Sequence, residues 1–227
     1  MDLMENTTHF KSTIESLFQG KFNSIVECKS CQHKSIQTHS FTELELPVQG
    51  HSNIEECIYS YLKEEELNGN NQYYCDYCQG LKDATKKIEL VELPNVLNLH
   101  LLRFVFDPKT FKKKKLHTNI KFPHLLTLLN KEYILSAVLI HRGQTANGGH
   151  YISHIRDDLK DNWWTFDDHK VSPIVELSTD SLDSTDSDKS TNNNDVSFVQ
   201  ESSKKRKTEN TQTTNTNTTA QGYIYNY

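Results

Sequence analysis

Alternating apolar and polar positions in the second half of the chain predict β-strands. Leu97, Leu99 and Leu101 alternate with Asn98 and His100, which is the two-residue period of a strand with one buried face. Other short stretches are rich in β-branched and aromatic residues, the side chains that favour strands. Together these patterns predict strands over residues 88–93, 96–106, 133–141, 151–155 and 163–166.

Two stretches nearer the start carry a helical period. Apolar residues at positions 10, 14, 17 and 18 predict a helix over about residues 10–17. A second helix is predicted over about residues 53–67, because Ser52 and Glu55 form a capping box and Gly69 follows as a stop signal. Early helices and many later strands predict an α+β fold with a mainly antiparallel sheet.

The composition changes sharply near Leu177. Apolar residues make up only 35% of the whole chain. Residues 178–222 are dominated by Ser, Thr, Asn and Asp, so they cannot bury enough apolar surface to offset the entropy of ordering, and we expect them to be disordered. Residues 223–227 are rich in tyrosine and suit a short strand. The disordered stretch is therefore interpreted as an insertion within a domain.

The charge pattern narrows the possible partners. The net charge of −5 argues against nucleic-acid binding over the whole surface. No apolar run reaches the roughly 18–20 residues of a membrane span, and the start lacks the layout of a secretion signal. We therefore expect a soluble, intracellular protein without a membrane partner. Lys112–Lys115 are expected at a solvated hairpin tip, and Lys204–Lys207 form either a nuclear import signal or a solubilising charge run.

Four of the five cysteines form two Cys-x-x-Cys pairs, Cys28 with Cys31 and Cys75 with Cys78. Two such turns facing each other supply the four thiolates of a tetrahedral Zn²⁺ site. Disulfides are disfavoured inside cells, and the alternative is a set of reduced thiols facing solvent. Cys57 lies on the apolar face of the predicted helix and is expected in the core, with a reactive thiol as the minor interpretation.

A histidine and an aspartate near the end form a second candidate site. Gly148 and Gly149 precede His150 and Tyr151 at the start of a strand, and Asp167 and Asp168 end the next strand. Two glycines allow a close backbone approach, and a carboxylate could fix the tautomer of the imidazole as in a catalytic triad. On these residues alone, a histidine beside a strand is more often a structural residue, and the two aspartates could simply begin a turn.

The whole set of motifs resembles the later part of a ubiquitin-specific protease catalytic domain, over about residues 18–174 together with the last strand. The resemblance rests on the order and spacing of several motifs rather than on any one. They are Phe18-Gln19-Gly20, the two Cys-x-x-Cys pairs, Leu93-Pro94-Asn95-Val96-Leu97, Leu102-Arg103-Phe104, Gly148-Gly149-His150-Tyr151, Trp164-Thr165-Phe166-Asp167-Asp168 and Tyr223-Ile224-Tyr225.

The resemblance implies a papain-like fold with a fingers region at about residues 20–90 and a palm at about residues 91–177. The partial catalytic domain would then span residues 1–177, the disordered insertion 178–222, and the last strand 223–227. The implied activity is thiol-dependent hydrolysis of the isopeptide bond after the C-terminal glycine of ubiquitin. Ubiquitin and ubiquitinated proteins are the implied partners, and the implied location is the nucleus and cytoplasm.

The resemblance also implies a role for each candidate residue. His150 matches the general base, Asp167 the residue that orients it, and Asp168 a neighbour that assists. Gly148, Gly149 and Tyr151 match the channel for the ubiquitin tail. The implied metal is structural zinc, held by the four paired cysteines Cys28, Cys31, Cys75 and Cys78 in fingers that hold the body of ubiquitin.

The family's nucleophile lies in an Asn-Thr-Cys-Tyr box, and none of the five cysteines here is preceded by threonine. We therefore expect the chain to begin partway through the fold, without the thumb, and to be unable to cleave by itself. The alternative function is an inactive ubiquitin-binding or scaffold module. A zinc-ribbon nucleic-acid binder is a distant third, because few basic residues flank the cysteine pairs.

Overall fold

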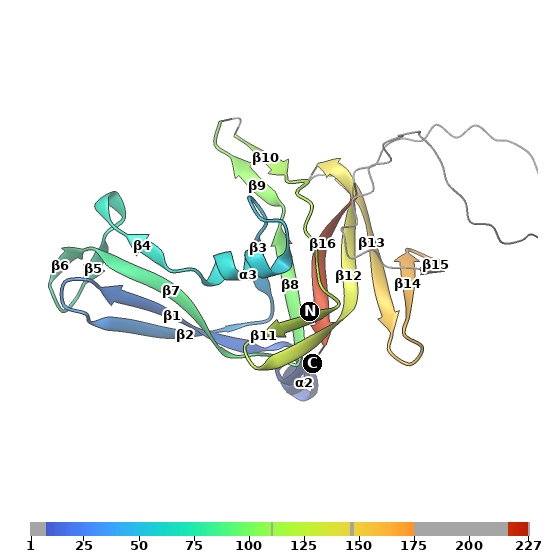
Figure 1. Cartoon of the computed structure of the whole chain (residues 1–227), viewed down its shortest axis with the longest axis horizontal. Coiled ribbons are helices and arrows are strands. Elements are labelled where there is room, and N and C mark those ends of the chain that lie inside the picture. The colour runs from blue at the N-terminus through green and yellow to red at the C-terminus, as the bar shows by residue number, and fades with distance from the viewer. Residues whose placement is uncertain (1–7, 110, 146–147, 175–217, 227) are drawn as a thin grey trace, which may run out of the picture.

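A computed structural model describes residues 8–109, 111–145, 148–174 and 218–226. Most of the expected insertion, including the basic run at 204–207, lies outside the described residues. Figure 1 shows two connected regions: a long strand-rich extension formed by the first half of the chain and a broad sheet formed by the second half. The described part has few helices and mostly antiparallel strands, which confirms the predicted α+β class.

The broad sheet forms the palm, and strands that are neighbours in its middle are distant in sequence. Strand β16, the last strand of the chain, lies between β12 and β8. The pairing of β3 with β8 is parallel. In spatial order the strands are β15 (Lys170–Ile174), β14 (Asn162–Asp167), β13 (Gly148–Asp157), β12 (Lys131–Thr145), β16 (Thr218–Asn226), β8 (Val96–Leu102) and β3 (Leu44–Pro47), with β11 (Leu125–Leu128) paired to β12.

One face of the palm sheet supplies the core. Leu97, Leu99 and Leu101 are buried as their alternation predicted, and they belong to one cluster with Tyr223 and Tyr225 of β16. Helix α3 (Ile54–Leu62) contributes its apolar stripe to the same cluster. Because β16 lies in the middle of the sheet, its side chains close this core between segments far apart in sequence.

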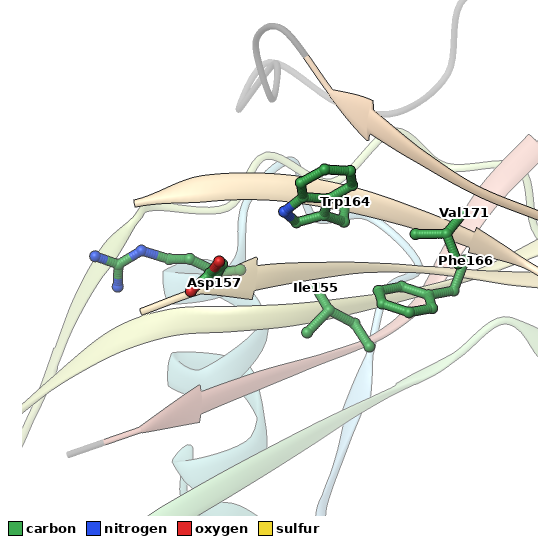
Figure 2. A pocket seen from close by; sticks show the side chains of 6 residues that line it. Ile155, Asp157, Trp164, Phe166 and Val171 are labelled. Carbon is green, nitrogen blue, oxygen red and sulfur yellow. The ribbon is translucent and has the colours of Figure 1, made fainter. Parts of the chain in front are cut away.

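The other face of the palm carries exposed apolar side chains. Along β13, Ile152 and His154 are buried whereas Tyr151 and Ile155 are exposed, as the two-residue period requires. Figure 2 shows a pocket on this face, where Ile155 lies close to Trp164, Phe166 and Val171 of the next two strands.

The extension forms the fingers and contains strands that the sequence patterns did not predict. The hairpin of β1 and β2 has a mixed burial pattern, so no clean alternation marks it. Helix α2 (Thr8–Phe18) precedes it, close to the predicted position. The finger strands are β2 (Lys34–Phe41), β1 (Gly20–Cys28), β7 (Ala84–Glu92) and β4 (Glu65–Leu67) in one sheet, and β5 (Tyr73–Cys75) with β6 (Gly80–Lys82) in a second, after the short helix η1 (Gly69–Asn71).

The predicted helix over about residues 53–67 starts close to the expected position, at Ile54, but its capping residues and its end were wrong. Asn53, rather than Ser52, is the N-cap, and its side chain accepts a hydrogen bond from the Glu56 backbone. The Glu56 carboxylate, rather than that of Glu55, accepts from the Ser52 backbone N–H at 2.8 Å. The helix ends at Leu62, and the glutamates that follow form β4, where Glu65 lies opposite Lys86 of β7 and Glu66 pairs with Lys29.

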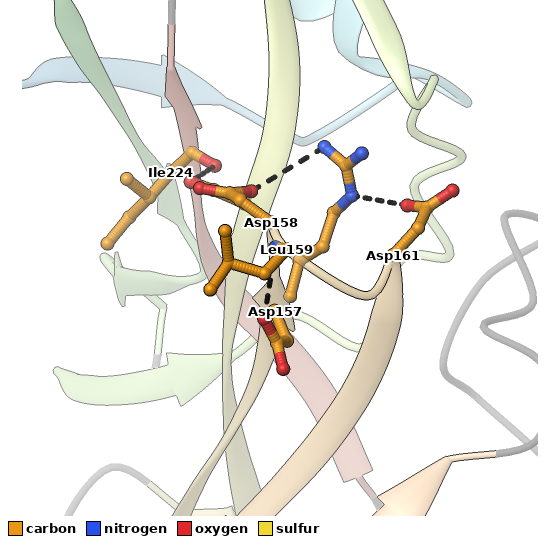
Figure 3. Close-up of polar contacts among 7 residues, drawn as sticks. Asp157, Asp158, Leu159, Asp161 and Ile224 are labelled. Carbon is orange, nitrogen blue, oxygen red and sulfur yellow. Dashed lines mark hydrogen bonds and ion pairs between the residues drawn. The ribbon is translucent and has the colours of Figure 1, made fainter.

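One hairpin extends from the palm sheet, and a second forms part of it. The predicted strand over residues 96–106 is divided at Arg103, which donates to the carbonyls of Leu116 and Thr118, so β9 (Phe104–Asp107) pairs with β10 (Lys112–Lys115) outside the main sheet. In Figure 3 the turn between β13 and β14 is closed by Arg156, which lies 2.7 Å from the Asp161 carboxylate.

The C-terminal strand begins earlier than expected. The strand was placed at residues 223–227, but β16 starts at Thr218, inside the stretch expected to be disordered. Its first residues pair with β12, where Thr218 lies opposite Arg142 and Thr219 opposite His141. Backbone pairing and β-branched residues therefore extend the strand in a segment of polar composition. Among the described residues, no helix is long and apolar enough to span a membrane.

The observed cap gives a direct test of the α3 N-terminus. Replacing Asn53 with alanine removes the acceptor for the Glu56 N–H and should lower the free energy of unfolding by about 1 kcal/mol. Glu55→Ala is the matched control and should have a much smaller effect. Urea unfolding measures both, and an equal loss for the two variants would restore the sequence-based placement of the cap.

Candidate active site and metal centre

The β13–β14 hairpin brings His150 and Asp167 together. Its register places Ser153 opposite Phe166, so Asp167, one residue further along β14, lies diagonally across from the beginning of β13. His150 Nε2 is 2.5 Å from Asp167 Oδ1. When an ionised carboxylate accepts this bond, Nε2 carries the proton and Nδ1 of the neutral ring keeps its lone pair. The pair therefore offers an oriented imidazole with one nitrogen available as a base.

Asp167 is held in its ionised form by its neighbours. The hydrogen bond from His150 is the main cause that lowers the pKa of Asp167, and the charge of Arg142 adds to it. Arg142 Nη1 lies 3.6 Å from Asp167 Oδ2, so the carboxylate faces the imidazole through one oxygen and the guanidinium through the other. Sequence analysis missed Arg142, which reaches the site because β12 pairs it with His150.

Asp168 begins the turn after β14. Its φ of 51° lies in the left-handed region, which aspartate tolerates better than most residues. It is exposed, and its carboxylate lies within 4.8 Å of the ligand atoms of both His150 and Asp167. The aspartate pair therefore has both expected features. Asp167 contacts the imidazole, and Asp168 forms the turn beside it.

The two glycines before His150 lie against the end of β12. Gly148 is exposed, and Gly149 has a φ of 157°. A Cβ at Gly149 would lie 2.2 Å from Nε2 of His141, so only glycine fits without a shift. Tyr151 is 51% exposed and packs its ring on His141 at a centroid distance of 4.7 Å.

His141 and Lys115 form a buried polar layer that sequence analysis missed. His141 is 3% exposed, and its Nδ1 has no hydrogen-bond partner among the described residues. An unpaired buried polar atom costs about 1–3 kcal/mol. Lys115, expected to be solvated, is instead 4% exposed and donates to the carbonyls of His141 and Gly143. The prediction that the whole lysine run faces solvent is therefore wrong for Lys115, because the end of β10 places this side chain against β12.

The metal candidate is built from two matching turns in the fingers. The first turn, with Cys28 and Cys31, joins β1 to β2, and the second, with Cys75 and Cys78, joins β5 to β6. In each turn the residue after the second cysteine has a left-handed backbone, with φ of 60° at Gln32 and 52° at Gln79.

One ring contact joins the two turns, and Lys29 of the first turn also contacts β4 and the residue between β6 and β7. The rings of His33 and Tyr77 stack at 5.8 Å, and the Lys29 side chain pairs with Glu66. The Lys29 backbone N–H also donates to the Asp83 carbonyl. The two turns therefore face each other, as the sequence spacing predicted.

The four sulfurs fit a tetrahedral Zn²⁺ ion. Cys28 Sγ lies 4.0 Å from Cys78 Sγ, and Cys31 Sγ lies 3.7 Å from Cys75 Sγ. Zinc–sulfur bonds of about 2.3 Å in a tetrahedron separate the sulfurs by about 3.8 Å. The four thiols are also free of disulfides, and all lie within 4.8 Å of one another.

The thiols in this cluster differ in acidity. A hydrogen bond from the Cys31 backbone is the main cause that lowers the pKa of Cys28 to about 7. Hydrogen bonding with Cys31 is the main cause that raises the pKa of Cys78 to about 12. Cys28 therefore ionises before Cys78, and a cation would be needed to hold all four as thiolates.

Cys57 lies in the core, as predicted. It is fully buried, and burial raises the pKa of its thiol to about 11. A buried thiol of high pKa is a poor nucleophile at neutral pH. Glu43, Glu45 and His100 also bring ligand atoms within 4.8 Å of one another, but the two glutamates are exposed and the set lacks soft ligands.

An imidazole fixed by a carboxylate, with one nitrogen free, is the arrangement of hydrolases that activate a nucleophile through histidine. The chain belongs to the ubiquitin carboxyl-terminal hydrolase family, whose model matches residues 2–227. This match confirms the resemblance seen in the sequence motifs.

Relatives in animals, plants and fungi share most of the chain. Ubiquitin carboxyl-terminal hydrolase 48 of Danio rerio is 43% identical over 188 residues, covering 77% of this chain and 18% of the relative. Ubiquitin carboxyl-terminal hydrolase 26 of Oryza sativa is 40% identical over 175 residues, covering 72% and 16%. Ubiquitin carboxyl-terminal hydrolase 13 of Saccharomyces cerevisiae is 34% identical over 175 residues, covering 73% and 23%. The match therefore spans less than a quarter of each relative.

The geometry predicts how Asp167 titrates when its partner is removed. His150→Ala should raise the pKa of Asp167, because the hydrogen bond from the imidazole is the main cause of its low value. A lowered carboxyl pKa contributes stability above the ordinary pKa of aspartate, and this contribution is lost as the pH falls through the native value. Carboxyl ¹³C NMR measures the titration. Asp168→Asn is the control and should not raise the pKa of Asp167.

Proposed function

We propose that this chain carries the base and the ubiquitin-holding parts of a thiol-dependent deubiquitinase that cleaves the isopeptide bond after ubiquitin's C-terminal glycine. The observation that carries this proposal is the contact of 2.5 Å between His150 and Asp167 in a member of this hydrolase family. Family membership supports ubiquitin and ubiquitinated proteins as the partners. The location in the nucleus and cytoplasm remains a proposal based on the basic run at 204–207.

In the proposed reaction, His150 takes the proton of a cysteine thiol, and the thiolate attacks the carbonyl carbon of the isopeptide bond. The imidazolium then protonates the leaving lysine amine, leaving a thioester. His150 next takes a proton from water, the hydroxide attacks the thioester, and the thiol is regenerated. Asp167 holds the ring through Nε2 throughout, so Nδ1 is the nitrogen that takes up each proton and gives it back, the last one to the departing sulfur as ubiquitin leaves with a free carboxylate. Asp168 adds a second carboxylate beside the pair.

The nucleophile of this reaction is proposed to be a cysteine other than the five in this chain. Cys57 is buried with a raised thiol pKa, and the other four cysteines form the sulfur cluster. These observations also favour the second candidate function for the 227 residues alone, a ubiquitin-binding module. Gly148, Gly149 and Tyr151 are proposed to line the channel for ubiquitin's tail, and Gly148 supports this because a Cβ built there would meet nothing within 4 Å, which leaves open space for an extended peptide.

The sulfur cluster is proposed to hold structural zinc through Cys28, Cys31, Cys75 and Cys78. The ion would neutralise the thiolates and fix the ends of the two finger hairpins, which are joined otherwise by surface contacts. Its contribution would be to folding rather than to the hydrolysis, because it would bind in the fingers while His150 and Asp167 lie in the palm.

Metal analysis tests the zinc proposal. The purified chain should contain one equivalent of zinc, and Cys75→Ser should lose most of it, because three sulfur ligands and a hydroxyl form a weaker site. Cys57→Ser is the matched control, since Cys57 lies in the core, and it should keep the metal. Metal-free wild-type chain, or equal metal loss in both variants, would refute the site.

Ubiquitin probes test the functional proposal. The 227-residue chain should bind ubiquitin in a pull-down but remain unlabelled by a thiol-reactive ubiquitin probe, and Cys57→Ala should change neither result. In a protein that contains this chain together with a nucleophilic cysteine, His150→Ala should lower kcat by roughly 10²–10⁴-fold. Labelling of the chain that Cys57→Ala abolishes would contradict the assignment of Cys57 as a core residue.

A further inference from the structure

The imidazole of His141 lies in a slot between two glycines at the open end of the β12–β13 hairpin. A Cβ at Gly149 would lie 2.2 Å from His141 Nε2, and a Cβ at Gly143 would lie 3.2 Å from His141 Cε1. Both glycines have large positive φ values, 157° and 154°. The ring therefore occupies the space that a side chain at Gly149 would take, while at Gly143 it borders a space that the backbone of Gly148 and Gly149 closes at 2.7 and 2.9 Å.

Other side chains close the slot around the ring. Tyr151 packs at 4.7 Å and Phe104 meets the ring edge-on at 5.8 Å. Lys115 donates to the backbone carbonyls of His141 at 3.2 Å and Gly143 at 2.6 Å, which ties the β9–β10 hairpin to this end of β12. The ring cannot shift without disturbing one of these neighbours.

The residues that form the slot are next in sequence to both side chains that contact Asp167. His141 precedes Arg142 on β12, and Gly149 precedes His150 on β13. Arg142 and His150 are register partners, and each reaches a different oxygen of Asp167. A change in the path of either strand at the slot would therefore change how the imidazole meets the carboxylate.

His141 is neutral in this position. Burial is the main cause that lowers its pKa, and the nearby charge of Lys115 acts in the same direction. A neutral ring does not compete with His150 or Arg142 for the Asp167 carboxylate. Its contribution is therefore its shape and its packing.

We propose that His141 is a positioning residue, whose ring fills the slot between Gly143 and Gly149 and thereby holds His150 in hydrogen-bonding contact with Asp167. The catalytic meaning of this role rests on the proposed function. The structural claim does not, because it concerns the geometry of His150 and Asp167 in the 227-residue chain.

Two NMR readouts on the chain test this role without any need for cleavage. Ring ¹⁵N shifts report which nitrogen of His150 carries the proton, and carboxyl ¹³C shifts report the pKa of Asp167. In the wild type, Nε2 should carry the proton. His141→Ala should give a mixture of tautomers and raise the pKa of Asp167 by a large part of the rise that His150→Ala causes.

His154→Ala is the matched control. His154 is a second buried histidine, on β13 itself, and it bonds to Thr165 rather than packing against a glycine. Its removal leaves a similar cavity in the same sheet, so both readouts should stay at their wild-type values even if the melting temperature falls. A folded His141→Ala chain with wild-type readouts would overturn the proposal, and so would an equal change in His154→Ala.

A second variant decides the question if His141→Ala does not fold. Lys115→Met keeps the buried stem and removes the ammonium that bonds to the His141 and Gly143 carbonyls. It should loosen the slot and give mixed His150 tautomers, and an unchanged single tautomer would count against the proposal. Loss of ubiquitin cleavage in a complete protein is a separate result, so failure of the proposed function is distinguishable from failure of this inference.

Discussion

The backbone register between β12, β13 and β14 is the constraint on which the candidate site depends. It places Arg142 beside His150, and it brings Asp167 at the end of β14 within 2.5 Å of the imidazole. A slip of one residue would turn each of these side chains to the opposite face of the sheet. The alternating burial along β13 opposes such a slip, because Ile152 and His154 would leave the core. The same alternation that builds the palm therefore aligns His150 with Asp167.

The palm and the fingers are held together by different physical means. The palm buries a continuous apolar core that includes the last strand, β16, between strands from earlier in the chain. Among the described residues the outer end of the fingers has no comparable core; its two cysteine hairpins meet through four sulfurs and a stacked ring pair, and an ion pair ties the first of them to β4. A thin, strand-rich extension of this kind gains most from a metal, because ligand binding replaces apolar burial as the source of order.

The sequence predicted those parts of the fold and site that depend on local patterns. The buried leucines of β8 and the sulfur cluster follow from alternation and from spacing along the chain, whereas the meeting of His150 with Asp167 was implied by the resemblance to the hydrolase family. Other features depend on partners distant in sequence. The end of α3 was missed because the glutamates after it form β4, which pairs with β7 and contacts Lys29, and β1 and β2 were missed because neither face is uniformly buried. His141 and Lys115 gain their importance only from packing against Gly149 and Gly143, which no local pattern encodes.

The proton on Nε2 of His150 tests the central claim most directly, because it exists as a slowly exchanging species only if the carboxylate holds it. If His150 and Asp167 form the hydrogen-bonded pair, this proton should give a far-downfield ¹H resonance in the folded chain near neutral pH, and the resonance should disappear in Asp167→Asn. Absence of the resonance in the wild-type chain, or its persistence unchanged in Asp167→Asn, would show that the two side chains do not form this pair.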